Sequence, residues 1–378
     1  MAWTERYCRS DAAGGGDGTT NTNSGANGAW TLAEAITNAA SGHRVNIRAG
    51  TYANTTTSRT FSNAGTATAP IWWRGFNTTI GDCDTDPSLT RPLITFTTGS
   101  CAFTGGHAWF SSVSWESSRT TGAGFASSAA TTPIIFVDCL FTATGANANS
   151  SAWSMGNATN CRFMRCGFVA TTTATGTVLS NAGTGNSQYS GCWFEGGATY
   201  CVITGNSGAY FDKCIFYDGN GDGIRIGGTG LVIVNDCDFN SLGSDGIEMT
   251  NNNISNLIVN CTFTSNGGYG INNNTGGNLN SIRMCNFFYN NTSGEENGFG
   301  DSPSPSNVSG SASPYVDAAN RNMRKTTASE IQDKGFPLWW VKNAWPSSAD
   351  GTNEFGAMQP ATSSGGGLAA NPLRGFIL

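Results

Sequence analysis

Charged residues are scarce in this sequence of 378 residues. Asp, Glu, Lys and Arg make up only 12% of the chain, and the formal net charge is −6. A nucleic-acid surface needs clustered Lys and Arg side chains that neutralise phosphates. We therefore expect no nucleic-acid partner.

Long apolar runs are missing as well. No stretch approaches the roughly 18 consecutive apolar residues of a membrane-spanning helix, so we expect no membrane partner. The opening MAWTERYCRSDAAGGGDG lacks the apolar segment of a secretory signal. The sequence thus predicts synthesis and folding in a cytoplasm, where cysteines remain thiols.

The spacings typical of metal ligands are also absent. The two histidines, His43 and His107, lie far apart, and none of the 12 cysteines forms a CxxC pair. Structural zinc sites use such paired ligands, so we predict no metal site and no cofactor. Pairing of Cys83 with Cys101 stays open, although a reducing compartment disfavours a disulfide.

Glycine, in contrast, is abundant. The chain contains 51 glycines, and Asn, Thr and Ser fill much of the remainder. These residues disfavour long helices and suit tight turns. The composition therefore indicates short strands joined by many turns.

A short unit with a cysteine two residues before a phenylalanine recurs seven times. Its cysteines are Cys139, Cys166, Cys192, Cys214, Cys237, Cys261 and Cys285, at steps of 27, 26, 22, 23, 24 and 24 residues. The apolar positions three residues earlier are Phe136, Phe163, Tyr189, Phe211, Val234, Ile258 and Ile282, and the aromatic positions two residues later are Phe141, Phe168, Phe194, Phe216, Phe239, Phe263 and Phe287. Val202, Ile224, Ile247 and Ile271 follow four of the cysteines by ten residues.

This repeat predicts stacked coils of short parallel strands. Residues i and i+2 of a strand share a face, so Cys and Phe are both expected to point inward. A unit of this size cannot bury its own apolar face, and therefore neighbouring units must stack. The cysteines then form a buried column of small apolar side chains rather than a reactive or metal-binding row.

The pattern extends upstream with less regularity, and its ends need covers. FSSVSW places Val113 and Trp115 in the Cys and Phe slots, and PLITF, IWWRGF and RVNIRAGTY read as earlier coils. TLAEAITNAASG predicts a capping helix that begins with a Thr31–Glu34 capping box. We expect an N-terminal strand and helix in 1–43, about ten coils in 44–292, a closing segment in 293–359, and a Gly-rich linker with a terminal tail in 360–378.

Two segments resemble those of pectate-lyase-like right-handed β-helix proteins. WTERYCRSDAAGGGDGTT with WTLAEAITNAASGHRVNIRAGTY is similar to their opening, and SPYVDAANRNMR, EIQDKG and EFGAMQ to their closing element. The resemblance implies an all-β, right-handed, single-stranded parallel β-helix over nearly the whole chain. Within that class the sequence looks most like tailed-phage virion proteins, such as tailspikes and capsid decoration proteins, which implies a homotrimer and host attachment.

A row of outer carboxylates is the candidate catalytic site. Stacking places Asp222 beside Asp245 and Arg225 beside Glu248, because each pair is 23 residues apart. Hydrolysis of a glycosidic bond needs two carboxyl groups roughly 5 to 9.5 Å apart. The alternative is that the Asp residues favour the turn backbone and that Arg225–Glu248 is an exposed pair of little energetic value. We favour this structural interpretation, without excluding an enzyme.

The terminal peptide NPLRGFIL is the candidate partner-binding segment. Leu373, Arg374, Phe376, Ile377 and Leu378 follow the Gly-rich linker, and an apolar peptide on a flexible linker suits docking into a partner. The sequence thus favours a non-catalytic spike or decoration protein in a phage virion, bound to capsid or tail proteins and in contact with host glycans. The alternative is a tailspike-type polysaccharide depolymerase, either a hydrolase or a lyase.

Overall fold

The computed structural model describes residues 2–54, 58–86, 88–127, 132–145, 151–156, 160–171, 176–181, 185–206, 208–251, 256–275, 281–299 and 306–326. These residues fall into two compact units, one up to Gln188 and one from Tyr189 onward. Strand β17 (Ser187–Ser190) contains the boundary. Within the described residues, no helix is long and apolar enough to cross a membrane.

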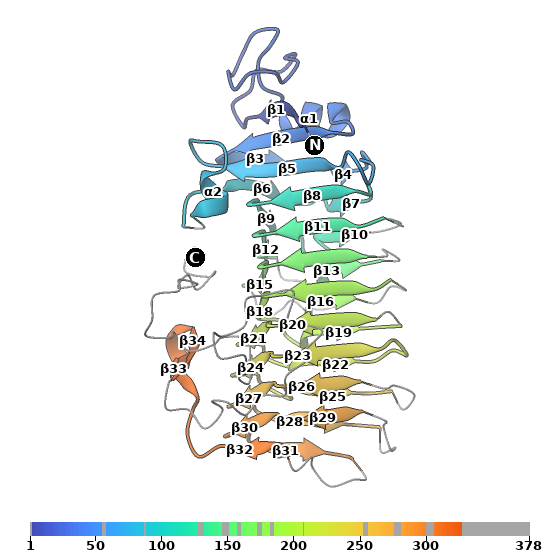
Figure 1. Cartoon of the computed structure of the whole chain (residues 1–378), viewed down its shortest axis with the longest axis vertical. Helices are drawn as coiled ribbons and strands as arrows, with labels where there is room; N and C mark the ends of the chain where they lie inside the picture. The colour runs from blue at the N-terminus through green and yellow to red at the C-terminus, as the bar shows by residue number, and fades with distance from the viewer. Residues whose placement is uncertain are drawn as a thin grey trace. The chain divides into compact units, whose positions relative to one another are not determined.

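The first unit consists of five complete coils, each with three short strands (Figure 1). Sheet A has the order β1 (Thr4–Cys8), β2 (His43–Arg48), β5 (Ile71–Phe76), β8 (Ala108–Ser111), β11 (Ile134–Val137) and β14 (Cys161–Met164). Sheet B contains β3 (Gly50–Asn54), β6 (Pro92–Phe96), β9 (Ser114–Ser117), β12 (Leu140–Ala143) and β15 (Gly167–Ala170). Sheet C contains β4 (Arg59–Phe61), β7 (Cys101–Phe103), β10 (Phe125–Ser127), β13 (Ser151–Met155) and β16 (Thr177–Asn181).

A short helix precedes the first coil, as the capping box predicts. Helix α1 spans Leu32–Asn38, and Thr31 and Glu34 form both reciprocal hydrogen bonds of the box. Leu32 and Ala35 are buried, which gives the helix an apolar face against the protein. A second short helix, α2 (Asp82–Thr85), lies between β5 and β6.

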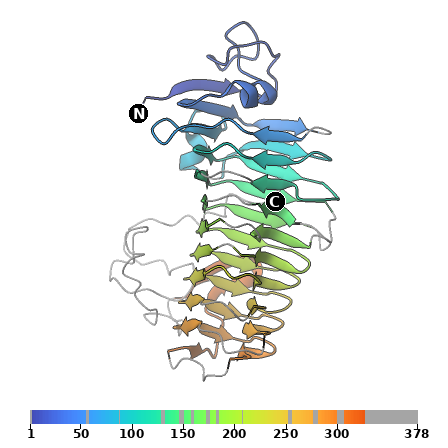
Figure 2. The same cartoon turned by 90° about the vertical axis from the view of Figure 1, so that its right-hand side faces the viewer.

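The second unit repeats the same architecture with four complete coils (Figure 2). Sheet A contains β20 (Ala209–Asp212), β23 (Val232–Asn235), β26 (Leu257–Val259) and β29 (Ile282–Met284). Sheet B contains β18 (Trp193–Glu195), β21 (Ile215–Tyr217), β24 (Asp238–Asn240), β27 (Thr262–Thr264), β30 (Phe287–Tyr289) and β32 (Val308–Ser309). Sheet C contains β19 (Tyr200–Thr204), β22 (Asp222–Ile226), β25 (Ile247–Met249), β28 (Tyr269–Asn273) and β31 (Gly294–Asn297).

The neighbouring strands of these three sheets pair in parallel, coil on coil, which confirms the predicted β-solenoid. Together with the coil of β17, β18 and β19, whose first strand contains the boundary, the described strands form ten three-strand coils. Strand β31 pairs with β28 and β32 with β30, so coil pairing continues past residue 292.

The corners between strands depend on residues with a left-handed backbone. A residue with positive φ lies between sheets A and B in coil after coil: Ser112, Asp138, Arg165, Gly191, Lys213, Asp236, Asn260 and Cys285. Non-glycine residues adopt this conformation at a cost of roughly 1 kcal/mol or more, so the burial of each coil's apolar face must offset it. In six of the seven Cys–Phe units the cysteine directly follows this corner residue.

The interior is formed by columns of like residues, as the repeat predicts. In the second unit Phe194, Phe216, Phe239 and Phe263 lie nearly parallel, with ring centroids 4.6 to 4.9 Å apart. Val202, Ile224, Ile247 and Ile271 pair in register in sheet C. The cysteines of the row are buried at the A–B corner rather than within a strand, and all 12 cysteines are free thiols, including Cys83 and Cys101.

The last Cys–Phe unit departs from the predicted register by one residue. Phe263 pairs with Phe288 rather than with Phe287, and Ile258 pairs with Arg283 rather than with Ile282. The cause lies at the corner, where Cys285 itself takes the left-handed conformation. Because side chains alternate along a strand, this slip turns Ile282 outward, where it is 52% exposed.

Candidate functional site

The candidate carboxylates lie on sheet C of the second unit. Asp222 begins β22, and Arg225 and Glu248 are opposite each other in β22 and β25. Asp245 lies just before β25, two residues ahead of Ile247. Coil stacking thus brings together the four residues that the spacing predicts to be neighbours.

Asp222 and Asp245 direct their carboxylates toward the backbone of the next coil. An Asp222 carboxylate oxygen accepts the backbone N–H of Asp245 at 2.9 Å. Asp245 accepts the backbone N–H of Tyr269 at 2.6 Å and the side-chain amide of Asn272 at 2.7 Å. Each carboxylate therefore satisfies a donor one coil further along, which makes it a structural link of the stack.

Burial changes the acidity of both groups. Desolvation raises the pKa of Asp222 to about 6, against the opposing effect of the hydrogen bonds from Ser244 and Asp245. Desolvation likewise raises the pKa of Asp245. An Asp carboxyl with a pKa near 6 can hold a proton close to neutral pH, which is the property of a general acid.

Arg225 lies between an aromatic ring and Glu248. Its guanidinium carbon is 5.0 Å from the centroid of the Tyr200 ring, and it donates a hydrogen bond to the Tyr200 hydroxyl. Its Nε is 3.5 Å from a Glu248 carboxylate oxygen, and Glu248 also accepts from Asn274 at 3.1 Å. A third of the Arg225 side chain remains exposed, so this pair contributes at most about 1 kcal/mol.

The other acidic residues of this part of the sequence lie on different elements. Asp218 is at a corner with positive φ after β21, and Asp236 is at the corner before β24, where it pairs with Lys213. Burial raises the pKa of Asp236 to about 7, although Lys213 acts in the opposite direction. Asp238 belongs to β24 of sheet B. These residues therefore do not join Asp222 and Asp245 on sheet C.

Sheet B of the second unit carries a hairpin that the repeat does not predict. Strands β33 (Tyr315–Asp317) and β34 (Asn322–Lys325), joined by the short 3-10 helix Ala318–Asn320, form an antiparallel pair beside it (Figure 1). The Lys325 ammonium pairs with the Asp238 carboxylate, and both side chains are 0% exposed. The Tyr315 hydroxyl donates to the same carboxylate at 2.9 Å, so the hairpin is held by a buried, hydrogen-bonded ion pair.

Sheet B of the first unit has a groove instead. It has a volume of about 340 Å³ and is lined by Gly50, Thr51, Thr90, Arg91, Leu93, Ser114, Glu116, Leu140 and Thr142. One Arg and one Glu are its ionisable groups. Two carboxyl groups, as hydrolysis requires, are not among these lining residues.

Metal chemistry has no candidate centre among the described residues. No group of three or more His, Cys, Asp or Glu side chains there could hold a metal ion. The predicted partner-binding residues Leu373, Arg374, Phe376, Ile377 and Leu378 lie outside the described residues.

Stacked parallel coils with three sheets define the class of the fold as a parallel β-helix. A family model described as "Right handed beta helix region" matches residues 144–293. The structure of pectate lyase Pel9A superposes with a TM-score of 0.67 at 15% identity, over 94% of this chain and 96% of that one. At this identity the likeness shows only the fold, a right-handed β-helix, and gives no information about activity.

Two further structures match less well. The ORF18 protein of Geobacillus virus E2 has a TM-score of 0.49 at 14% identity, over 80% of this chain and 60% of its own. A rhamnogalacturonan lyase has a TM-score of 0.49 at 13% identity, over 94% of this chain and 96% of its own. No curated protein sequence matches the chain significantly.

Proposed function

We propose that this chain is a non-catalytic structural β-helix, a spike or decoration protein of a tailed-phage virion. The proposal rests on the hydrogen bonds of Asp222 and Asp245, whose carboxylates accept backbone N–H groups of the next coil. A catalytic carboxyl must reach a substrate proton, whereas these two are 5% and 6% exposed. Their role is to hold the stack together.

The proposed role is mechanical and adhesive. Hydrogen bonding between successive coils makes a stiff body, and the surface, rich in Ser, Thr and Asn, contacts host glycans. The protein is proposed to be a homotrimer attached to capsid or tail proteins through its terminal segment, and so to reside in the virion after synthesis in the host cytoplasm. The resemblance of the opening, followed at the other end by a short tail after a Gly-rich linker, to tailed-phage virion proteins supports this assignment.

Particle assembly tests the proposal. Purified particles are expected to contain the full-length chain, detectable with an antibody against the coils. Deletion of 368–378 is expected to leave a folded solenoid, with an unchanged circular dichroism spectrum, that no longer joins the particle. Normal incorporation of the truncated chain would refute the anchor, and absence of the full-length chain from every particle fraction would refute the virion assignment.

A second candidate function is polysaccharide depolymerisation. The pKa of about 6 for Asp222, caused by burial, favours it because this carboxyl could donate a proton to a leaving group. The test is cleavage of a capsular polysaccharide or lipopolysaccharide by the wild-type protein, by Asp222→Asn and by Asp245→Asn. Cleavage that both substitutions abolish would establish the enzyme with Glu248 and Arg225 as neighbouring groups, and would overturn the non-catalytic proposal.

A further inference from the structure

Three tryptophans form a cluster on the outer side of sheet A in the first unit. Trp72 of β5 and Trp109 of β8 are in register on adjacent coils, and their ring centroids are 6.3 Å apart. Trp3, just before β1, lies 5.7 Å from Trp72 and 6.0 Å from Trp109. The planes cross at 58° to 67°, so each ring is braced by the edges or faces of the other two.

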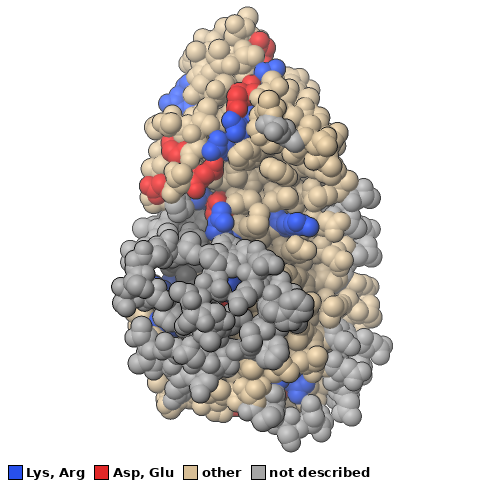
Figure 3. Space-filling model, viewed as in Figure 1, with Lys and Arg blue, Asp and Glu red and all other residues tan. Residues whose placement is uncertain are grey.

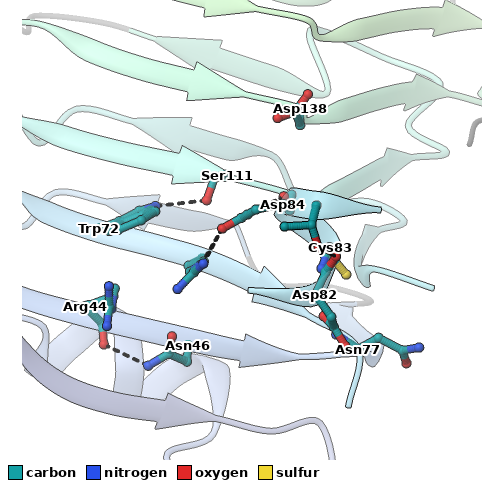
Figure 4. Close-up of polar contacts among 12 residues, drawn as sticks. Arg44, Asn46, Trp72, Asn77, Asp82, Cys83, Asp84, Ser111 and Asp138 are labelled. Carbon is teal, nitrogen blue, oxygen red and sulfur yellow. Dashed lines mark hydrogen bonds and ion pairs between the residues drawn. The ribbon is translucent and has the colours of Figure 1, made fainter. Parts of the chain in front are cut away.

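The Trp72 ring is fixed by polar contacts. Its indole N–H donates to the Ser111 hydroxyl at 2.9 Å (Figure 4). The guanidinium groups of Arg44 and Arg74 lie 5.2 and 5.0 Å from its ring centroid. These contacts hold the ring in one orientation before any ligand arrives, which lowers the entropic cost of binding.

The charges around the rings are balanced. Arg44 pairs with Glu5, and Arg74 pairs with Asp84. Figure 3 shows acidic and basic side chains gathered in one band in the upper part of the view. Asn46 donates a hydrogen bond to Glu5 at 2.8 Å. Rings, guanidinium donors and carboxylate acceptors therefore share this surface without a net excess of either sign.

Trp109 is the exposed member of the cluster, with 38% of its surface accessible. A large aromatic side chain in an outward slot of a strand loses burial that an inward slot would provide, about 25 cal/mol for each Å². The fold does not require this: Ile135 occupies the next slot of the same row, in register with Trp109 on β11. An exposed, braced indole is an amphipathic contact surface with few rotatable bonds.

We propose that Trp109, supported by Trp3 and Trp72, is the floor of a binding platform for neutral sugar units of a glycan chain. A pyranose ring presents C–H groups on its face, which pack on an indole, and hydroxyl groups around its rim, which hydrogen-bond to charged side chains. Arg44, Arg74 and Glu5 supply donors and an acceptor beside the rings. The proposal rests on the glycan contact in the proposed function and gives it a location.

Charge complementarity selects this occupant over an anionic chain. A polyanion needs uncompensated Lys or Arg, whereas both arginines at the platform already pair with carboxylates. The competing occupant is a second copy of the protein, which would bury the Trp109 face in the absence of any sugar.

Calorimetric titration of the full-length protein with neutral hexasaccharides of glucose, mannose, galactose and rhamnose tests the platform, with hexagalacturonate as the anionic comparator. At least one neutral sugar is expected to bind. Trp109→Ala should weaken that binding about tenfold, which corresponds to about 1.4 kcal/mol, because the sugar loses the ring on which it stacks. Trp109→Phe should retain most of it, and the matched control Ile135→Ala should leave it unchanged.

Three results would overturn the platform. The first is that no neutral sugar binds, and the second is that Trp109→Ala binds the sugar as tightly as the wild-type protein. The third is that Ile135→Ala weakens the binding as much as Trp109→Ala does. Concentration-dependent self-association that Trp109→Ala removes, without sugar binding, would assign the face to a second copy and so also refute it. Failure here leaves the particle-assembly test untouched, because that test measures incorporation and not glycan binding.

Discussion

The outer face of sheet B differs between the two units. In the first unit, Leu93, Ser114 and Leu140 follow one another in register and line a groove of about 340 Å³. In the second unit, the corresponding row contains Ile215, Asp238 and Thr262. There Asp238 binds Lys325 and Tyr315 of the hairpin. Among the described residues, one sheet face therefore carries a groove, and the other is covered by the protein's own hairpin.

The difference shows how a single acidic residue on the outer face of a sheet can determine which segment packs against that face. Leu140 needs no partner, but an ionised Asp238 cannot be buried without one, because an uncompensated buried charge costs several kcal/mol. Lys325 and Tyr315 supply a cation and a hydrogen-bond donor. On this account, acidic side chains in the second unit serve to fix the chain to itself, and the same holds for Asp222 and Asp245 on sheet C.

Breaking the buried ion pair should have the largest effect. Lys325→Met removes the cation and leaves the buried Asp238 carboxylate without a compensating charge, which should lower the free energy of unfolding by about 3–5 kcal/mol. Urea denaturation measures this loss, and limited proteolysis should show cleavage within 313–326.

The double variant Asp238→Asn/Lys325→Met is the matched control. It removes both charges together, so most of the stability should return. Equal stability of Lys325→Met and the wild-type protein would show that the pair does not hold the hairpin.

A smaller effect is expected at Asp222, whose partner is a backbone N–H rather than a cation. The folded state raises the pKa of Asp222 from 3.8 to about 6. Folding therefore binds this proton more tightly, and its contribution to stability is lost as the pH rises from about 4 to about 6. The amide of Asp222→Asn does not ionise and can still accept from Asp245.

Asp222→Asn should accordingly gain about 1–3 kcal/mol at pH 8 and nothing at pH 4, because one pKa unit corresponds to about 1.4 kcal/mol. The measurement is thermal unfolding of both proteins at the two pH values. A gain at pH 4, or a loss at pH 8, would contradict the assigned direction of the pKa shift.

Breaking the hairpin's second ion pair should change the free energy of unfolding least among these substitutions. Arg321 pairs with Glu195, but 46% of the Arg321 side chain is exposed. Arg321→Ala is therefore expected to lower the free energy of unfolding by no more than about 1 kcal/mol in the same urea experiment. A loss as large as that of Lys325→Met would show that burial does not distinguish the two pairs.

The cysteines of the two units should not differ in their reactivity toward a thiol reagent. All 12 are buried free thiols, and burial raises the pKa of those such as Cys139 and Cys214 well above the ordinary value. A thiol reagent is expected to label none of them in the native protein and all 12 after denaturation. Rapid labelling of native protein would identify a reactive site that the row does not account for.

Much of the fold follows from the sequence because like residues stack on like. The spacing of the Cys–Phe units placed the inward rows of sheets A, B and C, with Phe216 on Phe239 and Ile224 on Ile247. The single-residue slip at Phe288 was missed, since Cys285 adopts the corner conformation that the preceding residue adopts in other coils. Sequence spacing alone does not reveal which of two residues turns the corner.

The candidate site was predictable only where it repeats. Asp222 and Asp245 share a slot one coil apart, which the repeat reveals. Lys325 and Asp238 are 87 residues apart and belong to no repeat, so no spacing predicts their contact. Trp72 and Trp109 did carry a signal, because both occupy the outward slot beside an inward aromatic residue in IWWRGF and HAWFSS.

Thermal and urea unfolding of Asp245→Ala tests the central claim most directly. If the outer carboxylates serve the stack, removing the acceptor of Tyr269 and Asn272 should cost about 1–3 kcal/mol, because two partly buried donors lose their partner. Asp245→Asn, which keeps one acceptor oxygen, should lose less. Unchanged stability of Asp245→Ala would contradict the account and leave this carboxylate free for another role.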